Sequence, residues 1–214
     1  MKTYKQEFIK FCLEYDALRF GEFVLKSGRI SPYFFNAGCF NTGQAICKLG
    51  RFYAQAIVEA ELSYDMLFGP AYKGIPLVTA TVIAMFDEHG FDKPYAFNRK
   101  EAKLRGEGGT IVGTPLAGRI LLIDDVVTAG TTIHESAKLI QDAEATFSSM
   151  CVAVDRQEVG VESKISALKE AESKYQLSIT SIVTFTDLMQ FLYDIGSMEY
   201  YSAMQAYQAK YGVN

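Results

Sequence analysis

LLIDDVVTAGTT, residues 121–132, reads as a buried strand that ends in two carboxylates and continues into a turn of small and hydroxyl residues. The turn opens residues 131–142, which we predict to be a helix. In an open parallel sheet, ligands bind at the carboxyl ends of the strands, where this turn lies. Successive backbone N–H groups and hydroxyls can hold a phosphate there, and the helix dipole favours its negative charge. The residues placed to do so are Thr128, Ala129, Gly130, Thr131 and Thr132.

The two carboxylates, Asp124 and Asp125, are adjacent on an extended segment, so their side chains point in different directions. They suit sugar hydroxyls or a magnesium ion better than a paired acid–base dyad. A simpler interpretation is that they cap a strand and start a helix. Their position between a buried run and T-A-G-T-T favours a ligand site. The sequence contains no G-x-x-x-x-G-K-[ST], and GEGG at 106–109 does not complete G-x-G-x-x-G, which excludes an ordinary P-loop and a dinucleotide fingerprint.

The rest of the chain alternates between short apolar runs and segments with helical spacing. Strands of continuous Ile, Leu and Val separated by helices predict an α/β fold with a parallel sheet covered on both faces. The segment 22–35 reads as two extended runs around a Ser27-Gly28 turn. Strands are expected over 66–69, 95–98, 119–124, 148–155 and 177–185. Helices are expected over 3–15, from 41 or 42 onward, 75–88, 131–142 and 162–175. A final helix should use one face for packing, formed by Tyr200, Ala203, Met204, Tyr207 and Tyr211.

The bulk composition restricts the class of protein. A chain of 214 residues fits one α/β domain more easily than two, and a net charge of −4 argues against nucleic acid as the main partner. The four cysteines lack C-x-x-C spacing and only two histidines accompany them, so we expect buried free thiols in a reducing compartment. The longest apolar stretch, 75–86, is too short to span a bilayer, and the amino terminus lacks a signal-peptide core. We therefore expect a cytoplasmic protein with no membrane partner.

One stretch departs from the alternation. Residues 99–113, RKEAKLRGEGGTIVG, are rich in basic residues and glycine, and we predict a long flexible loop there. Considered alone, Lys100, Lys103 and Arg105 are equally compatible with a solvated basic loop.

LLIDDVVTAGTT resembles the phosphoribosyl-diphosphate-binding motif of the type I phosphoribosyltransferases. The resemblance extends over nearly the whole chain to the orotate phosphoribosyltransferase family, in its order and spacing. It implies a central parallel sheet flanked by helices in one domain over 1–214, with a small hood mainly from 1–40 and a mobile loop at 99–113. The further segments that carry it are KSGRISPYFFNAG (26–38), FGPAYKGIPL (68–77), FNRKEAK (97–103), GEGG (106–109) and DRQE (155–158).

The resemblance also implies a reaction. It is the Mg2+-dependent transfer of phosphoribose from 5-phosphoribosyl-1-diphosphate to orotate in pyrimidine synthesis, giving orotidine 5′-phosphate and diphosphate. The transition state should have oxocarbenium character. Mg2+ would be held mainly by the donor's diphosphate and ribose hydroxyls. The protein would be a homodimer whose active sites are shared across the interface.

The site residues follow from the matching segments. Asp124, Asp125, Lys26 and Lys103 are expected to be catalytic. Arg156 offers a planar fork suited to the orotate carboxylate, and a cationic lid would neutralise the diphosphate and exclude water. Phe34, Phe35, Thr128 and Arg156 are expected to bind orotate. The donor is expected to contact Lys26, Tyr72, Lys73, Arg99, Lys100, Lys103, Arg105 and the run from Asp124 through Val126, Val127, Thr128, Ala129, Gly130 and Thr131 to Thr132.

Some of these residues have simpler interpretations. Without the resemblance, adjacent Phe34 and Phe35 are more often core residues of a strand than base contacts, and Tyr72 and Lys73 alone indicate little. Where the family commonly has a histidine in the loop, this chain has Arg105, preceded by Leu104. A guanidinium can contact diphosphate but cannot donate a proton near neutral pH, so proton donation from this position is not expected here.

Two rival functions are compatible with parts of the pattern. A purine or uracil phosphoribosyltransferase would share LLIDDVVTAGTT without needing Phe34, Phe35 and Arg156. A non-catalytic regulator that senses the donor would be expected to carry a basic nucleic-acid-binding face or an added helix-turn-helix module. Incubation with donor, Mg2+ and a panel of bases distinguishes the three.

Overall fold

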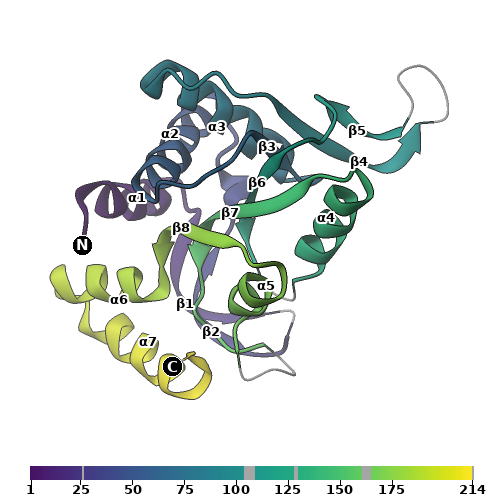
Figure 1. Ribbon diagram of the computed structural model, residues 1–214. Coiled ribbons are helices and arrows are strands. Elements are labelled where there is room, and N and C mark those ends of the chain that lie inside the picture. The colour runs from purple at the N-terminus through teal and green to yellow at the C-terminus, as the bar shows by residue number, and fades with distance from the viewer. Residues whose placement is uncertain (26, 104–108, 128–129, 161–164, 214) are drawn as a thin grey trace.

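A computed structural model describes residues 1–25, 27–103, 109–127, 130–160 and 165–213, without the side chains of Ala102 and Lys103 (Figure 1). In chain order the elements are α1 (Thr3–Glu14), β1 (Leu18–Val24), β2 (Ile30–Phe35), the 3-10 helix η1 (Ala37–Cys39), α2 (Gly43–Glu59), β3 (Met66–Gly69), α3 (Gly74–His89), β4 (Tyr95–Lys103), β5 (Gly109–Gly113), β6 (Arg119–Val126), α4 (Thr131–Asp142), β7 (Thr146–Asp155), α5 (Ala167–Tyr175), β8 (Ser178–Thr184), α6 (Phe185–Asp194) and α7 (Met198–Tyr211).

The main sheet has the strand order β5-β4-β3-β6-β7-β8. Every neighbouring pair is parallel except the edge pair β4–β5. After β3 the chain builds one side of the sheet with β4 and β5, and it then returns to β6 and builds the other side. The strand order therefore reverses between β3 and β6. Open α/β sheets bind their ligands at the carboxyl ends of the strands beside such a reversal.

Helices cover both faces of the sheet, as the continuous apolar strands predicted. Along β6, Leu121 and Ile123 pack into one core, formed with α1, α2, α3, α6 and α7, because successive side chains alternate between faces. Ile120 and Leu122 pack into the other core, with α4 and α5. All four are fully buried. This double burial fixes β6 rigidly and so fixes the position of the two aspartates that follow.

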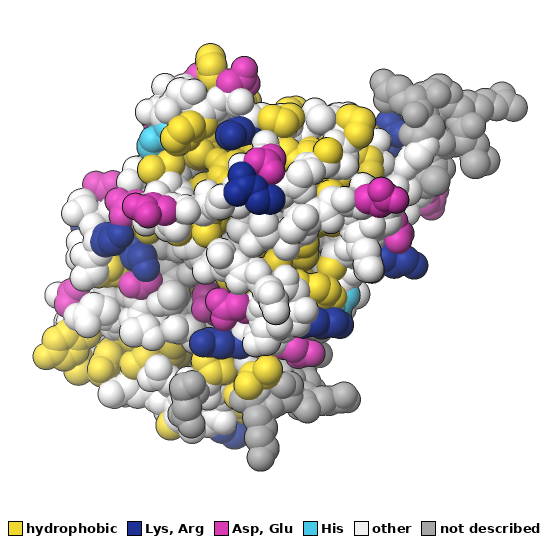
Figure 2. All heavy atoms as spheres, in the orientation of Figure 1, with side chains coloured by type: hydrophobic (Ala, Val, Ile, Leu, Met, Phe, Trp, Pro, Cys, Tyr) yellow, Lys and Arg dark blue, Asp and Glu magenta, His cyan; other side chains and the backbone are white. Residues whose placement is uncertain are grey.

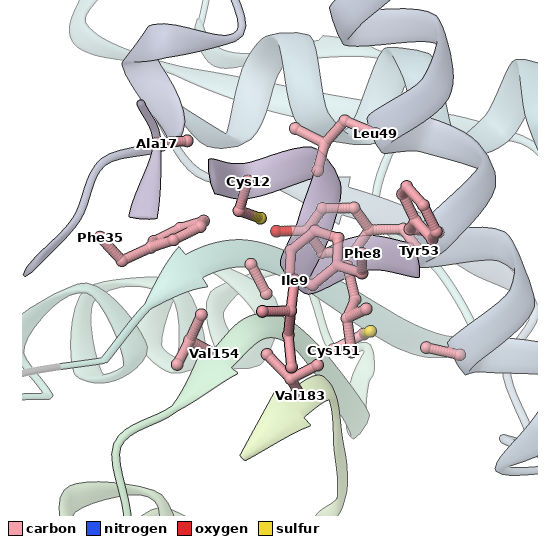
Figure 3. Packing of buried hydrophobic residues seen from close by; sticks show 14 of the residues in the cluster. Phe8, Ile9, Cys12, Ala17, Phe35, Leu49, Tyr53, Cys151, Val154 and Val183 are labelled. Carbon is pink, nitrogen blue, oxygen red and sulfur yellow. The ribbon is translucent and has the colours of Figure 1, made fainter. Parts of the chain in front are cut away.

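The first core extends into the amino-terminal hood. Figure 3 shows Phe8 and Ile9 of α1 directed at the strands, with Cys151 of β7 and Val183 of β8 beneath them. Phe35 of β2 joins the same cluster and lies 6.5 Å from Phe8, ring centroid to ring centroid. The antiparallel pair β1–β2 is thereby fastened to the main domain.

Three regions differ from the sequence prediction. The predicted loop over 99–113 is wrong for its described parts, because 99–103 continue β4 and 109–113 form β5. Pairing at an edge needs few buried side chains, and Phe97 opposite Val112 supplies the contact. Helix α6 follows β8 without a loop and was not predicted, whereas α5 begins at Ala167 rather than 162 among the described residues. In α7, Met204 and Tyr207 are buried but Tyr200 is 39% exposed, so the predicted stripe is only partly buried.

The start of α2, the cysteines and the length of the helices were also predicted from the sequence. Thr42, one of the two predicted caps, caps α2 by accepting the Ala45 backbone N–H. The cysteines are free, but only Cys12 and Cys151 are buried, and Cys47 is exposed. Within the described part of the chain, we find no helix with the length and apolar character needed to cross a bilayer.

Candidate functional site

Asp124 and Asp125 lie at the carboxyl end of β6, beside the reversal in strand order, and are 7% and 5% exposed. An oxygen of Asp124 accepts the Asp125 backbone N–H at 2.9 Å, and Oδ1 of Asp125 accepts the Val126 N–H at 2.9 Å. Oδ2 of Asp125 pairs with Nζ of Lys73 at 2.6 Å. The ion pair joins the carboxyl end of β6 to the loop after β3.

The loop after β3 is tightly folded. A Cβ on Gly69 would lie 2.2 Å from the carbonyl oxygen of Gly74, so the loop requires glycine there. The Ala71–Tyr72 peptide bond is cis, and Oδ1 of Asn98 on β4 accepts the Ala71 N–H at 2.7 Å. Tyr72 is 71% exposed, and the side chain of Lys73 is 55% exposed. Both predicted donor contacts therefore lie at the ligand-binding edge of the sheet, accessible to an anion.

Helix α4 begins immediately after the predicted phosphate turn. Gly130 is its N-cap, with a left-handed φ of 74°. A Cβ there would have its nearest neighbours at 3.8 Å, so backbone conformation rather than space favours glycine. Thr131 and Thr132 form the first turn, whose N–H groups are the unsatisfied donors of a helix amino end. Thr128 and Ala129 lie outside the described residues, as do Lys26, Leu104 and Arg105.

Burial and the negative charge of Asp125 together raise the pKa of Asp124 to about 7, against the opposing effects of the Asp125 N–H and Lys73. Its carboxyl group is therefore poised near neutral pH. A carboxyl in this state can accept a hydrogen bond when ionised and donate one when protonated.

This pKa predicts how stability depends on pH. Between about pH 4 and pH 7 the folded protein keeps a proton on Asp124 that the unfolded chain has released, so the free energy of unfolding falls as pH rises through this window. Asp124→Asn removes this contribution. We expect the variant to gain on the order of 1–3 kcal/mol over the wild type between about pH 4 and pH 8. Urea unfolding of both proteins at about pH 4 and about pH 8 measures this gain. A stability difference between the two proteins that is the same at both pH values would contradict the prediction.

The predicted orotate contacts divide between two environments. Arg156, after β7, is 7% exposed and lies against the hood strand β2, with its guanidinium carbon 4.6 Å from the ring centroid of Tyr33. Phe34 is half-buried on the other face of β2, stacked on Phe23 at 5.6 Å. The side chain of Phe35 is in the core, 6% exposed, so stacking on a base is open to Phe34 and not to Phe35 in this arrangement. The simpler interpretation of Phe35 as a core residue fits its position.

The basic residues lie along β4. Nζ of Lys100 is 3.5 Å from the carboxylate of Glu135 on α4, which places it beside the predicted phosphate turn of its own chain. Arg99 is half-buried. Lys103 ends β4, and its side chain is not described. Figure 1 shows β4 and β5 extending away from the body of the domain, so the basic residues run outward from the site.

Sequence reasoning missed several residues that organise the site. The hydroxyl of Tyr53 on α2 donates to the carbonyl of Asp124 at 2.8 Å, although its helical spacing indicated only a core residue. Asn98 lies within the quoted FNRKEAK segment but was given no role. Glu158 was likewise inside DRQE, and it contacts Nε of Arg156. A polar residue inside a matching segment was the available signal for the last two.

Comparison with known proteins agrees with this geometry. Residues 38–175 match the family described as phosphoribosyl transferase domain. Over its full length the chain is 56% identical to all of an orotate phosphoribosyltransferase from Thioalkalivibrio sulfidiphilus, and 55% identical to all of one from Aliivibrio fischeri. The chain belongs to the orotate phosphoribosyltransferase family. A crystal structure of the Francisella tularensis orotate phosphoribosyltransferase superposes with a TM-score of 0.89 at 41% identity, covering 96% of this chain and 99% of that one.

Membership confirms the resemblance, the α/β fold with its mostly parallel sheet, and the enzyme class. The chain is a phosphoribosyltransferase. Neither the purine or uracil transferase nor the donor-sensing regulator is favoured, since the match to orotate enzymes covers every residue of the chain.

Proposed function

We propose that this chain transfers phosphoribose from 5-phosphoribosyl-1-diphosphate to orotate, in the synthesis of pyrimidine nucleotides. The single observation that supports it best is the Lys73–Asp125 ion pair between the loop that follows β3 and the carboxyl end of β6. The pair supports a site in which Lys73 binds the diphosphate and the carboxylates bind the ribose, at the end of the strand whose turn leads into α4 and is suited to the 5-phosphate.

At the donor end, binding exchanges an internal ion pair for external contacts. Lys73, half-exposed, turns from Asp125 to the diphosphate, and the carboxylates of Asp124 and Asp125 accept from the ribose hydroxyls. The N–H groups of Gly130, Thr131 and Thr132 hold the 5-phosphate. Positive charge develops on the ribose as the bond to diphosphate breaks, and the buried carboxylates stabilise it more strongly than they would in water.

At the acceptor end, the guanidinium of Arg156 holds the carboxylate of orotate and directs the ring nitrogen at the ribose carbon. Phe34 of β2 offers its half-buried ring for stacking on the base. As the family resemblance implies, Lys26 and Lys103 act in catalysis and Thr128 contacts orotate. The basic segment 99–113, which includes the end of β4 and all of β5 and is called the β4–β5 arm below, closes over the diphosphate. Arg105 would contribute charge and no proton.

Magnesium fits this site without a protein cage. Both carboxylates are already engaged, Asp125 by Lys73 and Asp124 by a backbone N–H, and the described residues contain no group of three or more His, Cys, Asp or Glu that could hold a metal ion. Mg2+ commonly binds through one or two carboxylates together with substrate phosphates. Mg2+ would be held mainly by the donor's diphosphate and ribose hydroxyls, beside Asp124 and Asp125, and it would supply charge that stabilises the leaving diphosphate.

A homodimer is supported by helix α3. Its sequence is apolar on all sides, a pattern typical of a helix that is covered all round. In this single chain Ile83 and Phe86 are 54% and 57% exposed, and Phe91 just after the helix is 46% exposed. Figure 2 shows hydrophobic side chains gathered in the upper part of the molecule, where Figure 1 places α2 and α3. Ile83, Phe86 and Phe91 lie toward and just beyond the carboxyl end of α3, and a second copy packed there would cover this exposed apolar surface.

The function is tested by incubating the protein with donor, Mg2+ and each of orotate, uracil, adenine, guanine and hypoxanthine. We expect diphosphate release with orotate and with none of the other four bases. Release with another base and not with orotate would overturn the proposal, and binding of donor without turnover of any base would favour a sensor.

Arg156→Ala tests the acceptor site. The substitution removes a charge-assisted contact worth about 1.5–3 kcal/mol, so the KM for orotate should rise roughly 10- to 150-fold while the KM for the donor stays within about twofold. Steady-state kinetics with each substrate varied in turn measures this. Equal losses for both substrates would remove Arg156 from the orotate site.

A further inference from the structure

The guanidinium of Arg156 is held from three sides by described residues. Its Nε donates to Oε1 of Glu158, its Nη2 donates to Oγ of Ser31 at 3.1 Å, and its plane lies over the ring of Tyr33. The Ser31 hydroxyl in turn donates to the Tyr33 carbonyl at 2.7 Å, which directs its lone pairs at Arg156. A guanidinium has five N–H donors, and these contacts use only those on Nε and Nη2. The Tyr207 hydroxyl interacts with the guanidinium as well, and the N–H donors that these contacts leave are available to a ligand.

Glu158 is itself held by the carboxyl-terminal helix. The hydroxyl of Tyr207 on α7 donates to Oε2 of Glu158. Burial and this hydrogen bond raise the pKa of Tyr207 to about 12, so the hydroxyl remains a donor throughout the neutral range. Oε1 of Glu158 thus contacts Arg156, whereas Oε2 contacts Tyr207 and also lies 3.9 Å from Nη1 of Arg29. Glu158 is 15% exposed at its side chain, so both contacts are largely shielded from water.

The backbone around Glu158 is fixed by the same carboxyl-terminal segment. Val159 N–H donates to the Tyr211 carbonyl at 2.8 Å, and Val213 N–H donates to the Gln157 carbonyl at 2.9 Å. From the hood, Nη1 and Nη2 of Arg29 donate to the carbonyls of Val159 and Gly160 at 2.8 and 2.9 Å. The loop after β7 is therefore clamped between the hood and α7.

We propose that Glu158, held by Tyr207 of α7, is a positioning residue that sets the guanidinium of Arg156 for the carboxylate of orotate. The inference rests on the proposed role of Arg156 at the acceptor site. It assigns the carboxyl-terminal helix a part in substrate recognition, although no residue of α7 is among the expected substrate contacts. Arginine has several rotatable bonds, and fixing it before the ligand arrives lowers the entropic cost of binding.

Positioning and simple electrostatics predict opposite signs. The negative charge of Glu158 competes with the orotate carboxylate for Arg156, so on charge alone its removal would tighten orotate binding. If Glu158 acts by holding the guanidinium in place, its removal weakens orotate binding instead. The KM for orotate in Glu158→Gln therefore separates the two.

The experiment compares steady-state KM values for orotate and donor in Glu158→Gln, Tyr207→Phe and a control, Tyr201→Phe. Tyr201 lies on the same helix, and its hydroxyl contacts only the exposed Gln205 among the described residues. We expect the orotate KM to rise about tenfold in Glu158→Gln and about threefold in Tyr207→Phe, with the donor KM within about twofold in both. Tyr201→Phe should match the wild type. Tyr207→Phe removes a single hydroxyl and preserves the test if Glu158→Gln fails to fold.

Arg156→Ala distinguishes failure of the inference from failure of the proposed function. If Arg156→Ala raises the orotate KM while Glu158→Gln and Tyr207→Phe do not, Arg156 binds orotate without the positioning network. If Arg156→Ala itself leaves the orotate KM unchanged, the acceptor-site assignment is wrong. In the double variant Arg156→Ala with Tyr207→Phe, the hydroxyl should have no further effect on the orotate KM, because it acts through Arg156. An additive loss would make Tyr207 merely structural.

Discussion

Asp125→Asn should lower kcat about 30- to 1,000-fold while leaving the protein folded. The substitution removes a buried charge that faces the donor site, and loss of one such contact in the transition state costs about 2–4 kcal/mol. The fold should survive because Lys73, the partner left behind, has a side chain that is 55% exposed and can be hydrated. Single-turnover rates with saturating donor and orotate, beside a thermal unfolding curve, provide the measurement.

Asp65→Asn is the matched control. Asp65 also pairs with a basic residue, Oδ1 to Nη2 of Arg119 at 2.8 Å, but it lies at the amino ends of β3 and β6. The same chemical change at the far end of the same two strands should leave kcat within about twofold of the wild type. Near wild-type turnover in Asp125→Asn would remove this carboxylate from the mechanism, and an equal loss in both variants would point to the stability of the sheet.

The part of the site on β6 could be predicted from sequence because its signals are local. Strand, carboxylates, turn and helix start follow one another within residues 121–132, and the continuous apolar run predicts burial on both faces. Helix α6 was missed although it has a local signal. Thr184 and Asp187 form a capping box, a T-x-x-D pattern hidden because the preceding strand runs directly into it.

The acceptor side could be predicted only in part, because its contacts are distant in the sequence. Arg156 meets Ser31 across 125 positions, and Tyr207 meets Glu158 across 49. No periodicity within one segment reports such pairs. The adjacent residues Phe34 and Phe35 show the same limit. A strand places them on opposite faces, but only the packing of Phe35 against Phe8 of α1 determines which one the core takes.

The β4–β5 arm has one property that is visible in the sequence and one that is not. Its basic, glycine-rich composition can be read directly from residues 99–113. Its extended structure comes from antiparallel pairing of β4 with β5, which a sequence with few apolar residues does not predict. The paired residues are Ala96 with Gly113, Phe97 with Val112, and Asn98 with Ile111. Strand pairing at an edge is satisfied by backbone groups, whatever the side chains.

Two inactive variants should restore activity to each other if the active site is shared between subunits. One variant, Lys103→Ala, lacks a charge of the arm, and the other, Asp125→Asn, lacks the donor-site carboxylate. The arm extends away from the body of its own domain (Figure 1), and the exposed apolar face of α3 offers a surface on which a second copy can place it. In a two-fold dimer, each site would take its carboxylate from one chain and Lys103 from the other.

Mixing equal amounts after dissociation and reassociation then gives hybrids with one doubly defective site and one intact site. Random pairing makes half of the dimers hybrids, so activity should approach about a quarter of the wild type if the sites act independently. A Lys103→Ala sample reassociated with itself provides the baseline. If the arm instead serves its own chain, as the contact between Lys100 and Glu135 within one subunit would allow, every site in the mixture carries a defect. Hybrids confirmed by a tagged pull-down and still inactive would place each site within a single subunit, because no arrangement across the interface could then leave the intact site silent.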